Sequence, residues 1–203
     1  MTTRTIAHEL RVHAPFTAFG TMTGVIIMAV MIQMQVSKEI SEGLFWTLHP
    51  AHVFLSALVT TGMYRRHSPS GVFRTLLIGY AGSVGIATLS DSLIPYLGEI
   101  LLDLPNRHAH LGFIEKWWII NPLVLGGIAL AWIRPVTRLP HAGHVLLSTW
   151  ASLFHMTMAM GEQASAVMLV LVVVFLFLAV WVPCCTSDII FPLLFARPGD
   201  HKH

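Results

Sequence analysis

Long runs of apolar residues, separated by short polar breaks, dominate this chain. Six runs occur, at residues 14–36, 44–64, 72–101, 117–134, 142–161 and 165–196. A helix needs roughly 20 mostly apolar residues to cross the hydrocarbon core of a bilayer, which is about 30 Å thick. The breaks carry turn signals, such as Ser68-Pro69 after the second run and Arg134-Pro135 after the fourth. The pattern therefore predicts an all-α polytopic membrane protein with six transmembrane helices, forming a single membrane domain over residues 1–203.

Composition agrees with a chain whose main solvent is lipid. Of its 203 residues, 55% are hydrophobic and 11% are charged, whereas a soluble domain carries about 25% charged residues. The formal net charge of +2 is spread over the predicted loops, so no basic patch predicts nucleic-acid binding. The sequence contains no phosphate-binding glycine loop, HExxH helix or GxSxG elbow. It gives no direct sign of an enzyme.

The distribution of Lys and Arg predicts the orientation. With six spans, nine of the twelve basic residues fall on the side that holds both termini. The positive-inside rule then places both termini in the cytoplasm. We expect the membrane to be a plasma or inner membrane. The nine residues are Arg4, Arg11, Arg65, Arg66, Arg74, Arg134, Arg138, Arg197 and Lys202.

Two motifs recur in the same order. The pattern HxxHVxLS occurs at residues 49–56 and 141–148, and the pattern SDxxxPxL occurs at residues 90–97 and 187–194, with offsets of 92 and 97 residues. Each half, at about 14–104 and 115–196, would hold three helices. Because three is an odd number, the halves would enter the membrane from opposite sides, giving a 3+3 inverted repeat as in many secondary transporters. The alternative is a duplication kept only because it packs well.

The repeated residues suit metal binding. Histidines at positions i and i+3 share one face of a helix, and a carboxylate within a membrane span is costly and usually functional. Two imidazoles and one carboxylate suit Zn, Fe, Ni or Cu. We expect one cluster toward the outer side and one toward the inner side. Alternatively, the histidines bond backbone carbonyls and the aspartates bond neighbouring serines. The six residues are His49, His52, Asp91, His141, His144 and Asp188.

Seven further residues could extend these clusters. Two cysteines lie one turn before the second aspartate, where they could act as soft ligands or simply pack. Four residues follow the first aspartate, where they could capture ions or form a solvated loop. One histidine lies toward the outer end of the fifth span. These residues are Cys184, Cys185, Glu99, Asp103, His108, His110 and His155.

These patterns favour a membrane transporter for a transition-metal cation with paired His/His/Asp sites. A second hypothesis is a membrane-embedded haem or copper metalloprotein, serving as a redox subunit or as an oxidase or monooxygenase component. A third is a non-catalytic subunit of a membrane complex. Beyond lipid and metal, the small size favours a homodimer or higher oligomer, because six spans in 203 residues leave little protein to enclose a cavity.

Overall fold

The described part of the chain is helical and contains no strand, which confirms the all-α prediction. The computed structural model describes residues 3–68, 71–134, 138–160, 166–185 and 190–195. Its elements are α1 (Thr3–Gln33), α2 (Lys38–His67), α3 (Val72–Thr88), a π-helical segment η1 (Leu89–Leu93), α4 (Ile94–Leu101), α5 (Gly112–Glu115), α6 (Trp117–Ile133), α7 (Arg138–Met160), α8 (Ala166–Cys185) and α9 (Phe191–Leu194).

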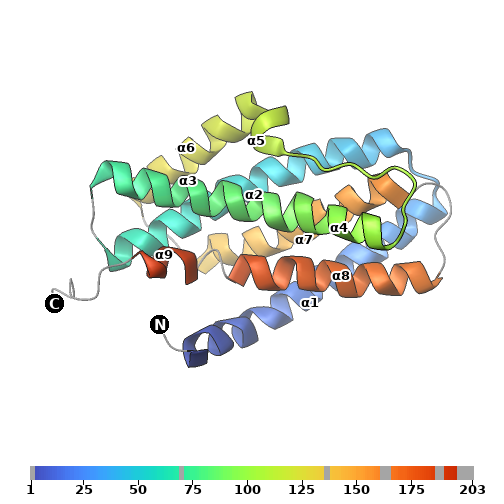
Figure 1. Cartoon of the computed structure of the whole chain (residues 1–203), viewed down its shortest axis with the longest axis horizontal. Helices are drawn as coiled ribbons and strands as arrows, with labels where there is room; N and C mark the ends of the chain where they lie inside the picture. Colours follow the sequence, from blue (N-terminus) through green and yellow to red (C-terminus); the bar gives the residue numbers. More distant parts are fainter. Residues whose placement is uncertain (1–2, 69–70, 135–137, 161–165, 186–189, 196–203) are drawn as a thin grey trace.

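Helices α2 and α7 form the centre of an elongated bundle. Figure 1 shows them running in opposite directions along the long axis, with the continuous stretch α3–η1–α4 and helix α8 beside them. Helices α1 and α6 flank the bundle on opposite sides. Helix α2 begins at Lys38, six residues before the predicted span at 44. This added length places His52 at the middle of the helix.

The two halves of the chain pack on each other reciprocally. Helix α6 packs on α2, and α1 packs on α7. Gly127 of α6 faces Phe54 and Ala57 of α2, and Gly20 of α1 faces Leu146 and Thr149 of α7. Leu146 and Thr149 lie 92 residues after Phe54 and Ala57, and the second HxxHVxLS motif follows the first at the same offset. The close helix contacts therefore recur at equivalent positions of α2 and α7.

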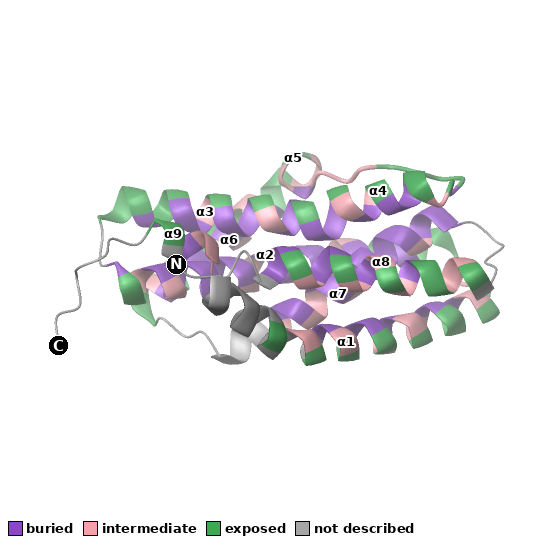
Figure 2. Cartoon of the chain, turned by 60° about the horizontal axis from the view of Figure 1, so that its bottom comes forward, coloured by how far each residue is buried: buried purple, intermediate pink, exposed green. Residues whose placement is uncertain are grey.

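Large apolar side chains remain on the outside of the bundle. Figure 2 shows exposed residues along α1, α3 and α8, with buried residues facing the interior. They include Phe19, Phe73 and Val170, which are 63%, 78% and 62% exposed. By length and composition, two stretches of the described residues could cross a membrane: Val72–Leu101 and Val167–Cys184. Two of the six expected spans thus meet this criterion, and Thr17–Gln33 and Trp117–Ile133 are shorter apolar helices.

The contact of α6 with α2 gives a first prediction. A methyl group added at Gly127 would lie 2.6 Å from the backbone oxygen of Phe54 and 3.0 Å from Cβ of Ala57, so Gly127→Ala must push the helices apart. Overpacking of this kind costs about 1–3 kcal/mol. We expect a lower melting temperature for the variant in detergent. Gly85→Ala is the matched control, because a methyl group there meets nothing within 4 Å. Equal melting temperatures for both variants would contradict this packing.

Candidate metal centre

The side chain of Asp91 lies at the centre of a buried polar network. Oδ2 lies 2.9 Å from Nδ1 of His49 and 2.6 Å from Nδ1 of His52. Oδ1 accepts hydrogen bonds from the hydroxyls of Ser90 and Ser148, at 2.7 and 2.8 Å. A carboxylate only accepts hydrogen bonds, so each imidazole donates its Nδ1 proton. Four donors thus compensate a carboxylate that is 0% exposed, which would otherwise be costly to bury.

Pro95 fixes the backbone around this aspartate. Proline has no N–H to offer the carbonyls four and five residues earlier, which belong to Asp91 and Ser90. Ser152 donates its hydroxyl to the Ser90 carbonyl at 2.8 Å, and Nδ1 of His155 lies 2.6 Å from the Asp91 carbonyl. The π-helical turn of η1 lies just before this proline, as such turns often do at functional sites. Helix α7 thus occupies the carbonyls that the proline frees.

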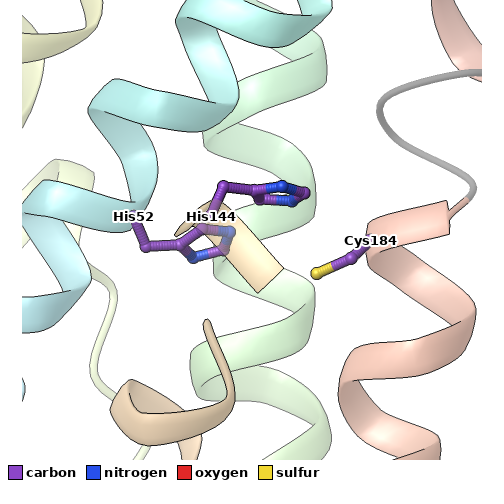
Figure 3. A group of neighbouring side chains, drawn as sticks. All are labelled: His52, His144 and Cys184. Atoms are coloured by element: carbon purple, nitrogen blue, oxygen red, sulfur yellow. The ribbon is translucent and has the colours of Figure 1, made fainter. Parts of the chain in front are cut away.

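A second group of side chains adjoins the first and shares His52. Figure 3 shows His52 from α2, His144 from α7 and Cys184 from α8 directed toward one another. Their nitrogen and sulfur ligand atoms lie within 4.8 Å of one another, and all three residues are buried. The two imidazoles are stacked, with centroids 5.1 Å apart and an interplanar angle of 20°. Cys184 also donates to the Ser148 hydroxyl at 3.5 Å.

Both groups of buried residues could hold a metal ion, but their geometries differ. In a tetrahedral zinc site, bonds of 2.0–2.1 Å place ligand atoms about 3.3 Å apart. The contacts of Asp91 with His49 and His52 are shorter, at 2.9 and 2.6 Å, and are hydrogen bonds. A carboxylate that accepts the second N–H of a metal-binding histidine fixes the tautomer and the ring orientation. The arrangement suits Asp91 as a residue that positions His52, whose Nε2 remains for an ion.

The further candidate residues from the loop after α4 and from α7 have three different surroundings. Asp103 is exposed and pairs with Arg107 at 3.1 Å, as expected of a solvated loop. Both ring nitrogens of His155 face carbonyl oxygens, those of Asp91 and His108, which leaves neither for a metal. His108, His110 and Glu115 bring ligand atoms within 4.8 Å of one another at the surface.

The expected separation of outer and inner clusters is wrong at His144. This residue stacks on His52 and does not lie at a different depth. The physical reason is the length of α2, whose start at Lys38 places His52 at mid-helix beside α7. Asp188 lies outside the described residues, and the side chains of His141 and Cys185 are not described.

Sequence reasoning did not assign the serines that complete the network. Ser148 closes the HxxHVxLS motif and contacts both Asp91 and Cys184. Ser152 follows one turn later on the same face of α7 and bonds the Ser90 carbonyl. The spacing of these serines from His144 was a usable signal, because positions four residues apart share a helix face.

No protein-family model, curated protein or solved structure matches this chain.

The network around Asp91 predicts a large effect of one substitution. Asp91→Asn places an NH₂ group among four hydrogen-bond donors, so at least one charge-assisted bond is lost. The free energy of unfolding should fall by roughly 1.5–3 kcal/mol, measured by denaturation of the metal-free protein in detergent. Asp103→Asn is the control, because the Asp103 side chain is 90% exposed. Equal stability of the two variants would mean that Asp91 does not hold the bundle together.

Proposed function

We propose that this chain is a membrane transporter for a transition-metal cation, which it binds between His52, His144 and Cys184. The observation that carries the proposal is the meeting of His52 and His144. These histidines are equivalent residues of the two HxxHVxLS motifs, 92 positions apart, and their rings stack at 5.1 Å. A ligand site that lies where two repeats meet is the usual arrangement in secondary transporters.

Reciprocal packing supports a twofold relation between the halves. The axis of such a relation passes between His52 and His144, since each is the counterpart of the other. The first helix of each half packs on the central helix of the other half, α1 on α7 and α6 on α2, which fits the same axis. Ile190, which is π-helical, is the counterpart of Leu93, the last residue of η1. We therefore propose a 3+3 inverted repeat, in which one half can move against the other around a central ion.

The surface supports a place in the bilayer. A core helix of a soluble protein is mostly buried, whereas the apolar windows of Val72–Leu101 and Val167–Cys184 are only 44% and 33% buried. Exposed apolar patches of this extent on a single chain mark an interface with a partner or with lipid. Here they run along several helices on different sides of the bundle (Figure 2), as contact with lipid requires.

The ligand set favours a single metal ion over haem. The nitrogen lone pair with which an imidazole binds a metal lies in the plane of its ring. Because the rings of His52 and His144 are stacked, their lone pairs can point to the same side, toward one ion. Haem would need its two histidines on opposite faces of the macrocycle. A thiolate with two imidazoles suits Zn²⁺ or copper. This geometry also makes the redox-subunit hypothesis the weaker one.

Loss of one central ligand should reduce both metal binding and transport. Replacing one of three ligands by Cys184→Ser or His144→Ala should lower the affinity for Zn²⁺ by at least the roughly 10–100-fold that the loss of a ligand's hydrogen-bond partner already costs. Equilibrium dialysis of the purified protein and flux into proteoliposomes would measure the two effects. His67→Ala is the matched control, because His67 is exposed at the end of α2 and contacts the Met63 carbonyl. Wild-type binding and flux in both central variants would refute the proposal.

The proposed orientation has its own test. The loop that carries His108 and His110 should face outward, because most basic residues lie on the other side. A single cysteine at Ala109→Cys, in a chain with both native cysteines replaced by serine, should react with an impermeant maleimide in intact cells. Gly71→Cys, in an exposed position between α2 and α3, should react only after permeabilisation. The reverse pattern would invert the topology.

A further inference from the structure

A cavity of about 280 Å³ opens on the side of the bundle that carries the loop between α4 and α5. Its walls include three histidines and two carboxylates, from α2, α4, α7 and this loop. Two basic residues also line it, and one of them, Arg107, is paired with Asp103 at 3.1 Å. The charged and imidazole side chains of the wall are Lys38, Glu42, Glu99, Arg107, His108, His110 and His155.

Two histidines of the cavity wall, His108 and His110, are already assembled with Glu115, which lies beside the cavity. Nδ1 of His110 lies 3.1 Å from Oε2 of Glu115, and the rings of His108 and His110 are 4.5 Å apart. Oε1 of Glu115 accepts a 2.6 Å bond from the Leu111 backbone N–H, which holds the carboxylate in place. Ligand atoms of all three lie within 4.8 Å of one another. His110 and Glu115 would have to exchange their 3.1 Å hydrogen bond for bonds to the ion. Small side-chain rotations at this surface position would then bring all three residues onto one ion and leave a fourth position for water, as at open zinc sites.

Another residue of the cavity wall, Glu99, has a carboxylate oxygen without a hydrogen-bond donor among the described residues. Glu99 is 0% exposed, and its Oε2 accepts the backbone N–H of His108 at 3.1 Å. Its Oε1 lies 3.4 Å from Nε2 of His155, and no described residue donates a hydrogen bond to it. A buried carboxylate oxygen in this state is costly. A cation in the cavity would compensate it.

One aromatic ring, that of Phe45, contacts two histidines of this cavity and His49 of the Asp91 network. Phe45 is fully buried and its ring centroid lies 5.6 Å from that of His110, 5.3 Å from that of His155 and 5.3 Å from that of His49. The stacked contact with His49 has an interplanar angle of 11°. Phe45 therefore joins the cavity wall to the Asp91 network, while the group of His108, His110 and Glu115 shares no residue with that of His52, His144 and Cys184.

We propose that His108, His110 and Glu115 form a second cation site, which receives the ion before it passes Glu99 toward the central site, and that the ion is a divalent borderline cation of the Zn²⁺ class. The identity of the ion rests on the proposed function, because we infer it from the ligands of the outer site and of the central site together. Two imidazoles and a carboxylate exclude a strong preference for Cu(I), which favours thiolate and thioether. The central thiol in turn disfavours Mg²⁺, Ca²⁺ and Mn²⁺. Zn²⁺ accepts nitrogen, oxygen and sulfur ligands alike.

Cobalt(II) can report the two sites separately, because it replaces Zn²⁺ and gives a near-ultraviolet charge-transfer band only where a thiolate is bound. We would titrate the purified full chain in detergent with Co²⁺ and then with Zn²⁺. The wild type should bind two ions per chain, one of them with the thiolate band. His110→Ala and Glu115→Gln should each lower the affinity of the outer ion at least on the order of tenfold and leave the band unchanged. Cys184→Ser should remove the band and leave the outer ion.

The control variant and the contrary outcomes distinguish the second cation site from the central site of the proposed function. His67→Ala should bind as the wild type does, since His67 is exposed and lies outside the three-residue group and the cavity wall. One ion per chain with the thiolate band, or unchanged binding in the His110 and Glu115 variants, would overturn the outer site and leave the central one standing. Two ions without a thiolate band would overturn the central site. Tighter binding of Cu(I) than of Zn²⁺ at the outer site would overturn the assignment of the ion.

Discussion

The buried carboxylate of Asp91 constrains the rest of the structure. A charged group without access to water needs hydrogen-bond donors in fixed positions, because leaving it unsatisfied costs several kcal/mol. Helix α2 supplies two of these donors, α7 supplies Ser148, and Ser90 supplies the fourth. The register of α2 against α7 therefore follows from this one group. The position of His52 beside His144 is a consequence of that register, so the proposed ligand set depends on a residue that is not itself proposed to bind the ion.

Two copies of a motif bring one histidine each to the same place in the bundle, and the proposed metal site is therefore shared by both halves of the chain. His52 and His144 are each other's counterparts, yet their surroundings differ, since His52 is held by Asp91 and the third ligand comes from α8. The first helix of each half also differs. Gly20 and Gly127 make equivalent contacts at an offset of 107 residues, against 92 for the histidine motifs. The longer end of α1 after Gly20 and the longer start of α2 before His49 together account for the difference.

Local chemistry made part of this structure predictable. Each of the six apolar runs is helical over its described residues except at the ends of three of them, at 34–36, 134 and 195, because hydrophobic runs bounded by Pro and charge have few other solutions. The grouping of His49, His52 and Asp91 also followed from helix spacing and motif order. The stacking of His52 on His144 did not, because it depends on where α2 begins, and the apolar pattern starts six residues after Lys38. The role of His155 was hidden for a related reason: its partners are backbone carbonyls of Asp91 and His108, which no side-chain pattern records.

The three residues of the proposed central site come from three different helices. His52 lies on α2, His144 on α7 and Cys184 on α8, and Ser148 of α7 contacts both Asp91 and Cys184. A site built in this way binds an ion tightly when all three helices are close and weakly when one of them has moved away. The proposed transport needs both states, because an ion that is held equally well throughout the cycle is never released. A movement of any one of these helices against the other two would therefore change the affinity of the proposed site.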